Sequence, residues 1–176
     1  MMVRLLRSAR LLALAFWVGG ISFFVIGVAP VAFSHAILDA TGSTKVSGMM
    51  VGESLERLHW IGIVCGVVLL VSGVGVYVVC KCGQGLMIAE ALVTLAMMFG
   101  TAYSMMHIIP LMNHDRALVG GDFSRVAADS PEKLDFDKLH HRSTQVEGGV
   151  LLLGLLLVVL TAGEPLERRR EEWLER

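Results

Sequence analysis

The sequence has little charge for its length. Charged side chains make up 18% of its 176 residues, while 55% of the residues are hydrophobic. A soluble domain of this size would carry more charge. Because fifteen basic residues nearly balance sixteen acidic ones, the composition also excludes a nucleic-acid binder with a dominant basic surface. The scarcity of charge indicates a protein whose solvent is lipid.

Motifs of several common chemistries are also missing. The chain has no phosphate-cradling glycine motif, no triad-like constellation, no zinc-knuckle spacing and no HxxxH or HExxH pattern. It has only three cysteines, Cys65, Cys80 and Cys82, and none falls in a loop that we place outside the cell. This number and placement do not indicate a disulfide framework.

Four apolar runs lie between the patches of charge, and each can cross a bilayer core of about 30 Å. We predict membrane helices over about residues 11–34, 58–80, 86–110 and 141–163. Residues 36–55, rich in glycine and serine, are predicted to form the first loop, and residues 111–140 form a polar extracytoplasmic loop. Because the first run is too long for a typical signal peptide, we expect it to be retained. The prediction is a single all-α domain over residues 1–176, an up-down-up-down bundle of four transmembrane helices.

The second half of the chain repeats features of the first half. The segment Glu56–His59 precedes the second apolar run, and Asp137–His140, which has the same pattern of acid, base, leucine and histidine, precedes the fourth. Pro30 in the first run matches Pro110 in the third, at an offset of 80 residues. We therefore interpret the bundle as two related helical hairpins. In the last polar segment, Ser130 and Pro131 are typical of a helix start.

Basic residues favour one orientation. Four spans place both termini on the same side, which carries eight basic residues on short segments. The other side carries seven, on longer loops that also hold ten acids. The excess of basic residues on short segments predicts cytoplasmic termini.

All six histidines fall at the opposite, extracytoplasmic end in this arrangement. Helix bundles hold metals and haem with imidazoles from facing helices, and neutral imidazole suits zinc, copper and iron. Carboxylates such as Glu147 could complete a shell or orient a ring. An alternative is a polar rim, or a substrate or proton site without metal. The candidate metal or haem ligands, in order, are His59, His140, His107, His35, His141 and His114.

Sulfur-containing residues offer a weaker sign of copper chemistry. Soft thioethers favour Cu(I), and Met98, Met105 and Met106 lie near His107. Methionine also fills irregular contacts between helices, and we favour packing as the explanation.

Glu90 is an acid inside the third predicted span, about one turn from its cytoplasmic boundary, and an intramembrane carboxylate is a functional hypothesis by default. Its counterpart at the repeat offset of 80 is Arg10. We predict an ion pair between Arg10 and Glu90 across the first and third helices. Proton transfer at Glu90 is the alternative.

Several short motifs carry a family resemblance. They are Leu14–Gly20 leading to Ala29-Pro30, Leu58–Gly62, Ile109-Pro110 with Arg116, and Phe136 with Leu139-His140 and Ser143. Through these pieces the chain resembles bacterial four-helix membrane proteins of unknown function that are related to the eukaryotic transmembrane protein 205-like domain. The first helix, through Trp17-Val18-Gly19-Gly20, is also locally similar to the copper-resistance D membrane family. The resemblance implies a small protein of the bacterial inner membrane with no established reaction.

Three functions remain open from the sequence, and it does not decide whether any reaction is catalysed. The first is binding of haem, copper or zinc by the histidines, for metal handling or electron transfer. The second is a non-catalytic subunit or assembly factor of a larger membrane complex, or a homo-oligomer, because the second run is rich in glycine. The third is a small transporter. It needs a polar path between the histidines and Glu90, for which only Thr94, Thr101 and Ser104 are available.

Overall fold

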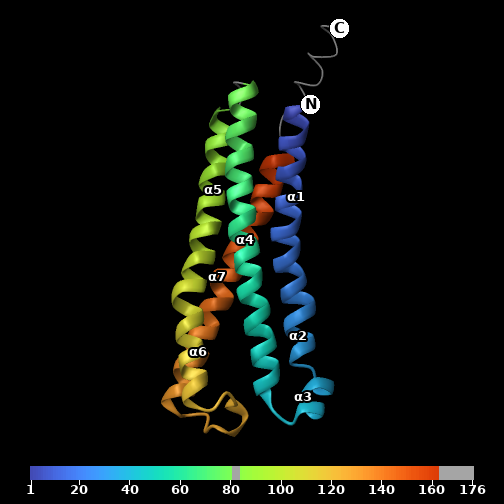
Figure 1. The fold of residues 1–176 in the computed structure, drawn as a ribbon. Coiled ribbons are helices and arrows are strands. Elements are labelled where there is room, and N and C mark those ends of the chain that lie inside the picture. The colour runs from blue at the N-terminus through green and yellow to red at the C-terminus, as the bar shows by residue number, and fades with distance from the viewer. Residues whose placement is uncertain (81–83, 163–176) are drawn as a thin grey trace.

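A computed structural model of the chain describes residues 1–80 and 84–162, and these residues contain helices and no strand (Figure 1). Cys82 and residue 163, the predicted end of the last span, lie outside the described residues. The elements are α1 (Met2–Phe23), the π-helix η1 (Phe24–Val28), α2 (Ala29–Ala32), α3 (His35–Thr41), α4 (Thr44–Cys80), α5 (Gln84–Tyr103), the π-helix η2 (Ser104–Ile108), α6 (Ile109–Leu118), the 3-10 helix η3 (Phe123–Arg125) and α7 (Pro131–Ala162).

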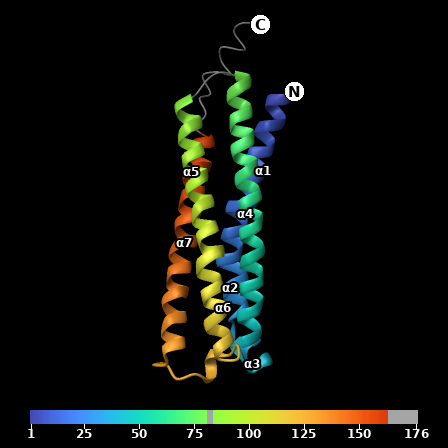
Figure 2. The ribbon, with the colours of Figure 1, turned by 60° about the vertical axis from the view of Figure 1, so that its left-hand side comes forward.

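Four continuous helices are long and apolar enough to cross a membrane, namely Met2–Ala32, Thr44–Cys80, Gln84–Leu118 and Pro131–Ala162. They alternate in direction, as Figures 1 and 2 show, so the predicted all-α membrane bundle is confirmed. We call the end with α3 and η3 the histidine end, and the end with Met1 and Ala162 the terminal end. The first hairpin is α1 with α4, and the second is α5 with α7.

The helices extend beyond the apolar runs, so the predicted loops are too long. Most of residues 36–55 and of 111–140 is helical, and only 119–130 separates α6 from α7. Gly48 and Gly52 lie one turn apart on α4, where the guanidinium of Arg116 covers them. The Arg116 guanidinium also lies 5.5 Å from the ring centre of Phe136 on α7. These contacts explain why glycines that are typical of a turn lie inside a helix here.

The predicted start of the fourth helix at Ser130-Pro131 is confirmed. Helix α7 begins at Pro131, and the Ser130 hydroxyl accepts a hydrogen bond of 3.3 Å from the Lys133 amide. Nearby, Asp122 accepts hydrogen bonds from the hydroxyl and the amide of Ser124, which lower its pKa, and from Thr44 at the start of α4. The 119–130 connection is thereby tied to the first hairpin.

The two π-helices reproduce the repeat in the backbone. They occupy Phe24–Val28 and Ser104–Ile108, which are equivalent at the offset of 80, and Pro30 or Pro110 follows each within the next turn. A proline removes one helical hydrogen bond and crowds the carbonyl four residues earlier. Local π-helical winding accommodates this disturbance. The sequence repeat is therefore also a structural repeat.

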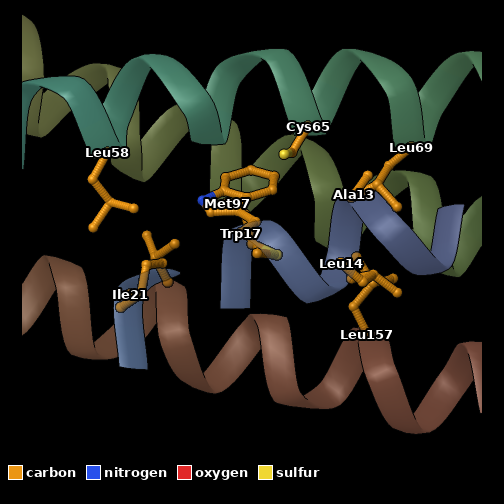
Figure 3. Packing of buried hydrophobic residues seen from close by; sticks show 10 residues of the cluster. Ala13, Leu14, Trp17, Ile21, Leu58, Cys65, Leu69, Met97 and Leu157 are labelled. Atoms are coloured by element: carbon orange, nitrogen blue, oxygen red, sulfur yellow. The ribbon is translucent and has the colours of Figure 1, made fainter. Parts of the chain in front are cut away.

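Trp17 and Met97 lie at the centre of the core, 1% and 0% exposed (Figure 3). Two glycines of α4 make this packing possible. A Cβ at Gly62 would lie 2.5 Å from Trp17 Nε1, and a Cβ at Gly66 would lie 2.5 Å from Met98 Cγ. Helices α1 and α5 therefore pack against nearly bare backbone of α4, in the manner of small-residue contacts in membranes.

Gly62→Ala should destabilise the bundle by about 1–3 kcal/mol, because its methyl group collides with the indole of Trp17. Gly73→Ala is the matched control on the same helix, since a Cβ there has no atom within 4 Å. Unfolding of both variants in detergent, followed by circular dichroism, would measure the difference. Equal stability of the two variants would contradict the close packing at Gly62.

Candidate functional site

One histidine is buried, and it is paired with a carboxylate. His59 on α4 places Nε2 2.6 Å from Oε1 of Glu147 on α7, and the two side chains are 2% and 10% exposed. Glu147 reaches this position because it lies on the buried face of α7, one turn from Ser143 and from Val150. The Nδ1 atom of His59 is also buried, and it has no hydrogen-bond partner among the described residues.

Either partner in this contact can hold the proton. The pair can exist as imidazolium and carboxylate, or as neutral imidazole and carboxylic acid, and the position of the hydrogen is not fixed by the heavy atoms. Both forms have the same total charge. A proton can therefore move along the 2.6 Å contact without leaving a net charge in the membrane.

A second buried pair lies toward the terminal end. Nη2 of Arg10 on α1 is 2.6 Å from Oε2 of Glu90 on α5, as the repeat predicted. The Thr161 hydroxyl donates to the other oxygen of Glu90 at 3.2 Å. Because a guanidinium does not give up its proton in proteins, this pair stays ionic. Arg10, Glu90, Thr94, Met87 and Leu157 help to line a cavity of about 20 Å³ beside it, enough for one water molecule.

Both buried pairs connect one hairpin with the other. Arg10–Glu90 joins α1 to α5, and His59–Glu147 joins α4 to α7. Charges are expensive in lipid unless they are paired, so each pair favours the assembled hairpins over separated ones. The pairs therefore have a structural role in addition to any chemistry.

A stripe of polar side chains runs along the buried face of α5 and η2 between the two pairs. Its members share one face because they recur every three, four or seven residues. They are Glu90, Thr94, Thr101 and Ser104, all 6% exposed or less, and Met97 interrupts them. The hydroxyl oxygen of Ser104 is buried and has no hydrogen-bond partner among the described residues.

The register between α5 and α7 relates this stripe to Glu147. Thr161 bonds Glu90, and Gly154 packs against the end of Met97. Val150 is the nearest neighbour that a Cβ on Gly100 would meet. Continued by one turn, the same antiparallel register brings Ser104 level with Glu147. Ser104 thus lies near the level of the His59–Glu147 pair in the bundle.

The other five predicted histidine ligands remain exposed. His107 lies beside Tyr103, with ring centres 5.5 Å apart. His140 stacks on Phe136, and His141 contacts Gln145. His35 and His114 are also exposed. Within the described ranges, no three His, Cys, Asp or Glu side chains are close enough together to hold a metal ion. The histidines share an end of the bundle, but only His59 turns into its interior.

The pairing of His59 with Glu147 was not predicted from the sequence, in which Glu147 is expected only to complete or orient a metal site. A signal was available in the spacing of Ser143, Glu147, Gly154 and Thr161, small or polar residues that recur at helical intervals. This spacing indicates a buried polar face on the fourth helix rather than a wet helix end.

Removal of one charge from the Arg10–Glu90 pair should destabilise the bundle by about 3–5 kcal/mol, because the partner is left uncompensated. We expect Arg10→Leu and Glu90→Leu each to show this loss in detergent unfolding, and the double variant to recover most of it. Arg4→Leu is the control, because Arg4 is exposed on the same helix. If the losses simply added in the double variant, the two side chains would not be coupled.

Comparison with known proteins identifies a family without an assigned reaction. Residues 12–117 match the family model described as "Domain of unknown function (DUF4149)". No curated protein and no solved structure matches the chain. The family match agrees with the expected class of uncharacterised membrane protein, but it does not support the finer resemblances to the transmembrane protein 205-like domain or the copper-resistance D family. Because the match covers more than half of the chain, the chain belongs to the DUF4149 family.

Proposed function

We propose that this protein carries protons across the bacterial inner membrane, and that the His59–Glu147 pair is its proton-exchanging group. The observation that carries the proposal is a histidine and a carboxylate in contact inside a membrane bundle, 2.6 Å apart and almost fully buried. Ionisable groups are costly in a membrane, and such groups mark proton relays and ion pathways.

The two buried pairs differ in what they can do. Arg10 holds its proton permanently, so Arg10–Glu90 serves as a fixed charge pair. An imidazole nitrogen can both accept and donate a proton, and the carboxylate partner can accept the proton from it. Of the two pairs, only His59–Glu147 can therefore load and unload a proton while the bundle stays intact.

The polar stripe supports a route from this pair toward the other end. A transporter requires polar groups between the histidines and Glu90, and Thr94, Thr101 and Ser104 all turn to the buried side of α5 and η2. Hydroxyl groups both donate and accept hydrogen bonds, so each can pass a proton along a hydrogen-bonded chain. With cytoplasmic termini, as the distribution of basic residues favours, the His59–Glu147 pair is on the periplasmic half and Glu90 on the cytoplasmic half.

A metal-linked function has one supporting observation. A histidine that contacts a carboxylate through one ring nitrogen presents the other nitrogen as a metal ligand, and Nδ1 of His59 is unpartnered. The described residues do not supply the further ligands that a zinc or copper site needs. Haem does not fit between α1, α4 and α5, because Gly62 and Gly66 contact Trp17 and Met98 directly.

Purified protein in liposomes should dissipate an imposed pH gradient faster than empty liposomes, because the pair offers protons a route through the bundle. We expect His59→Asn and Glu147→Gln each to lower the rate by about tenfold or more, since each removes one of the two proton acceptors. His114→Asn is the control, an exposed histidine at the same end. A trapped pH-sensitive dye, with valinomycin to clamp the potential, would report the flux.

Wild-type flux equal to that of empty liposomes would contradict the proposal. The His59–Glu147 pair would then be a structural tie, as expected of a non-catalytic subunit. Circular dichroism and gel filtration of each variant would separate lost transport from lost folding.

Elemental analysis would test the metal-linked alternative directly. If His59 exchanges protons, we expect the purified protein to hold no copper, zinc or iron that depends on this residue. The comparison of wild type with His59→Ala provides the measurement. Near-stoichiometric metal in the wild type that disappears in the variant would instead assign His59 to metal handling.

A further inference from the structure

We propose that Met97 is the gate of the proton route, an apolar side chain that separates two polar half-routes and must move for a proton to pass. This inference rests on the proposed function. It assigns a role to a residue that neither buried pair contains. Met97 is 0% exposed and lies on the central level of the core, beside Trp17 (Figure 3).

The buried face of α5 and η2 is polar on both sides of Met97. Toward the histidine end it carries Thr101 and Ser104, the latter level with the His59–Glu147 pair. Toward the terminal end it carries Thr94 and Glu90. Met97 is the one fully buried apolar residue between Glu90 and Ser104. The stripe therefore consists of two polar segments with a single interruption.

The interruption is wider than a hydrogen bond. Thr94 and Thr101 are seven residues apart, which corresponds to about 10 Å along the helix axis. A hydrogen bond spans only about 3 Å, so a proton crosses this gap only along water molecules. Apolar constrictions of this kind gate pores by excluding water. Met97 occupies the position that those water molecules would need.

The surroundings of Met97 allow it to move. Its Cε lies 3.2 Å from the position of a Cβ on Gly154, so the end of the side chain rests against a part of α7 that has no side chain. Methionine has three rotatable side-chain bonds and adapts readily to irregular space. The neighbouring positions of the α7 face, Val150 and Leu157, are apolar and cannot carry the proton instead.

Space for water already exists on one side of the gate. Thr94, Glu90 and Leu157 are among the residues that line the cavity of about 20 Å³, so it lies on the terminal side, one turn from Met97. One water molecule fits in this volume and finds polar partners at its wall. A displacement of Met97 would extend this space toward Thr101 and join the two polar segments.

Met97→Ser should raise the proton flux in liposomes about tenfold, because the hydroxyl is smaller than the thioether side chain and binds water. Met106→Ser is the matched control, since Met106 is 67% exposed on the same long helix. The increase should disappear in the double variant with His59→Asn, which removes the proton-exchanging group. The pH-sensitive dye in the liposomes gives all these rates.

A second variant acts in the opposite direction and keeps the test decisive if Met97→Ser does not fold. Gly154→Ala places a methyl group against Met97 Cε and 2.7 Å from Val18 Cγ2. It should restrict Met97 and lower the flux to a small fraction of the wild-type rate. Gly148→Ala on the same helix is its control, because a Cβ there has no atom within 4 Å.

The outcomes separate the gate from the proposed function. If the wild type conducts protons and the Met97 and Gly154 variants conduct at the same rate, the gate is overturned and the proposed function stands. If the wild type is silent but Met97→Ser conducts in a manner that depends on His59, the proposed function of the wild type is overturned, while Met97 is supported as the barrier that closes the route. If no variant conducts, both are overturned.

Discussion

The need to pair every buried charge in lipid determines how this bundle is assembled. There are two buried pairs, and each hairpin carries one residue of each pair. Neither hairpin can therefore bury its polar side chains without the other. Arg10 meets Glu90 and His59 meets Glu147, both at 2.6 Å. In hydrocarbon an unpaired charged side chain has no water to solvate it. The free-energy cost of separating the two hairpins is therefore high. The pairs therefore specify which helices meet, while Trp17, Met97 and the glycines of α4 supply the close packing.

The internal repeat explains where the pairs lie and why they differ. Arg10 and Glu90 occupy equivalent positions of the two hairpins, so the same site carries opposite charges and pairs across the axis of the repeat. His59 has an equivalent in His140, but that histidine is exposed and stacks on Phe136. At the offset of 81 residues that relates His59 to His140, Glu147 corresponds to Gly66, which packs against Met98. The Arg10–Glu90 pair thus follows the symmetry of the repeat, whereas the His59–Glu147 pair has no equivalent in the other half of the repeat.

The parts of this structure that could be predicted depend on one-dimensional patterns. The apolar runs predicted four spans, and the offset of 80 predicted the Arg10–Glu90 pair. The rotation of each helix about its own axis is not contained in such runs, because it is decided by packing against neighbouring helices. Rotation turns His59 inward and leaves His107 and His114 exposed. Helix ends were also misjudged, since Gly48 and Gly52 are typical of turns until Arg116 covers them.

The two pairs give the bundle one fixed and one adjustable contact between its hairpins. Arg10–Glu90 cannot become neutral by internal proton transfer, because arginine retains its proton, so it holds the terminal half together in every state. A proton that moves within the His59–Glu147 pair changes it from ionic to neutral and leaves its total charge the same. A proton that the pair exchanges with its surroundings changes the total charge by one. Because a net charge is costly at this depth, each such change weakens the contact between α4 and α7. Under the proposed function, proton exchange would therefore loosen the contact between α4 and α7, and the π-helices beside Pro30 and Pro110 lie in the same half of the bundle.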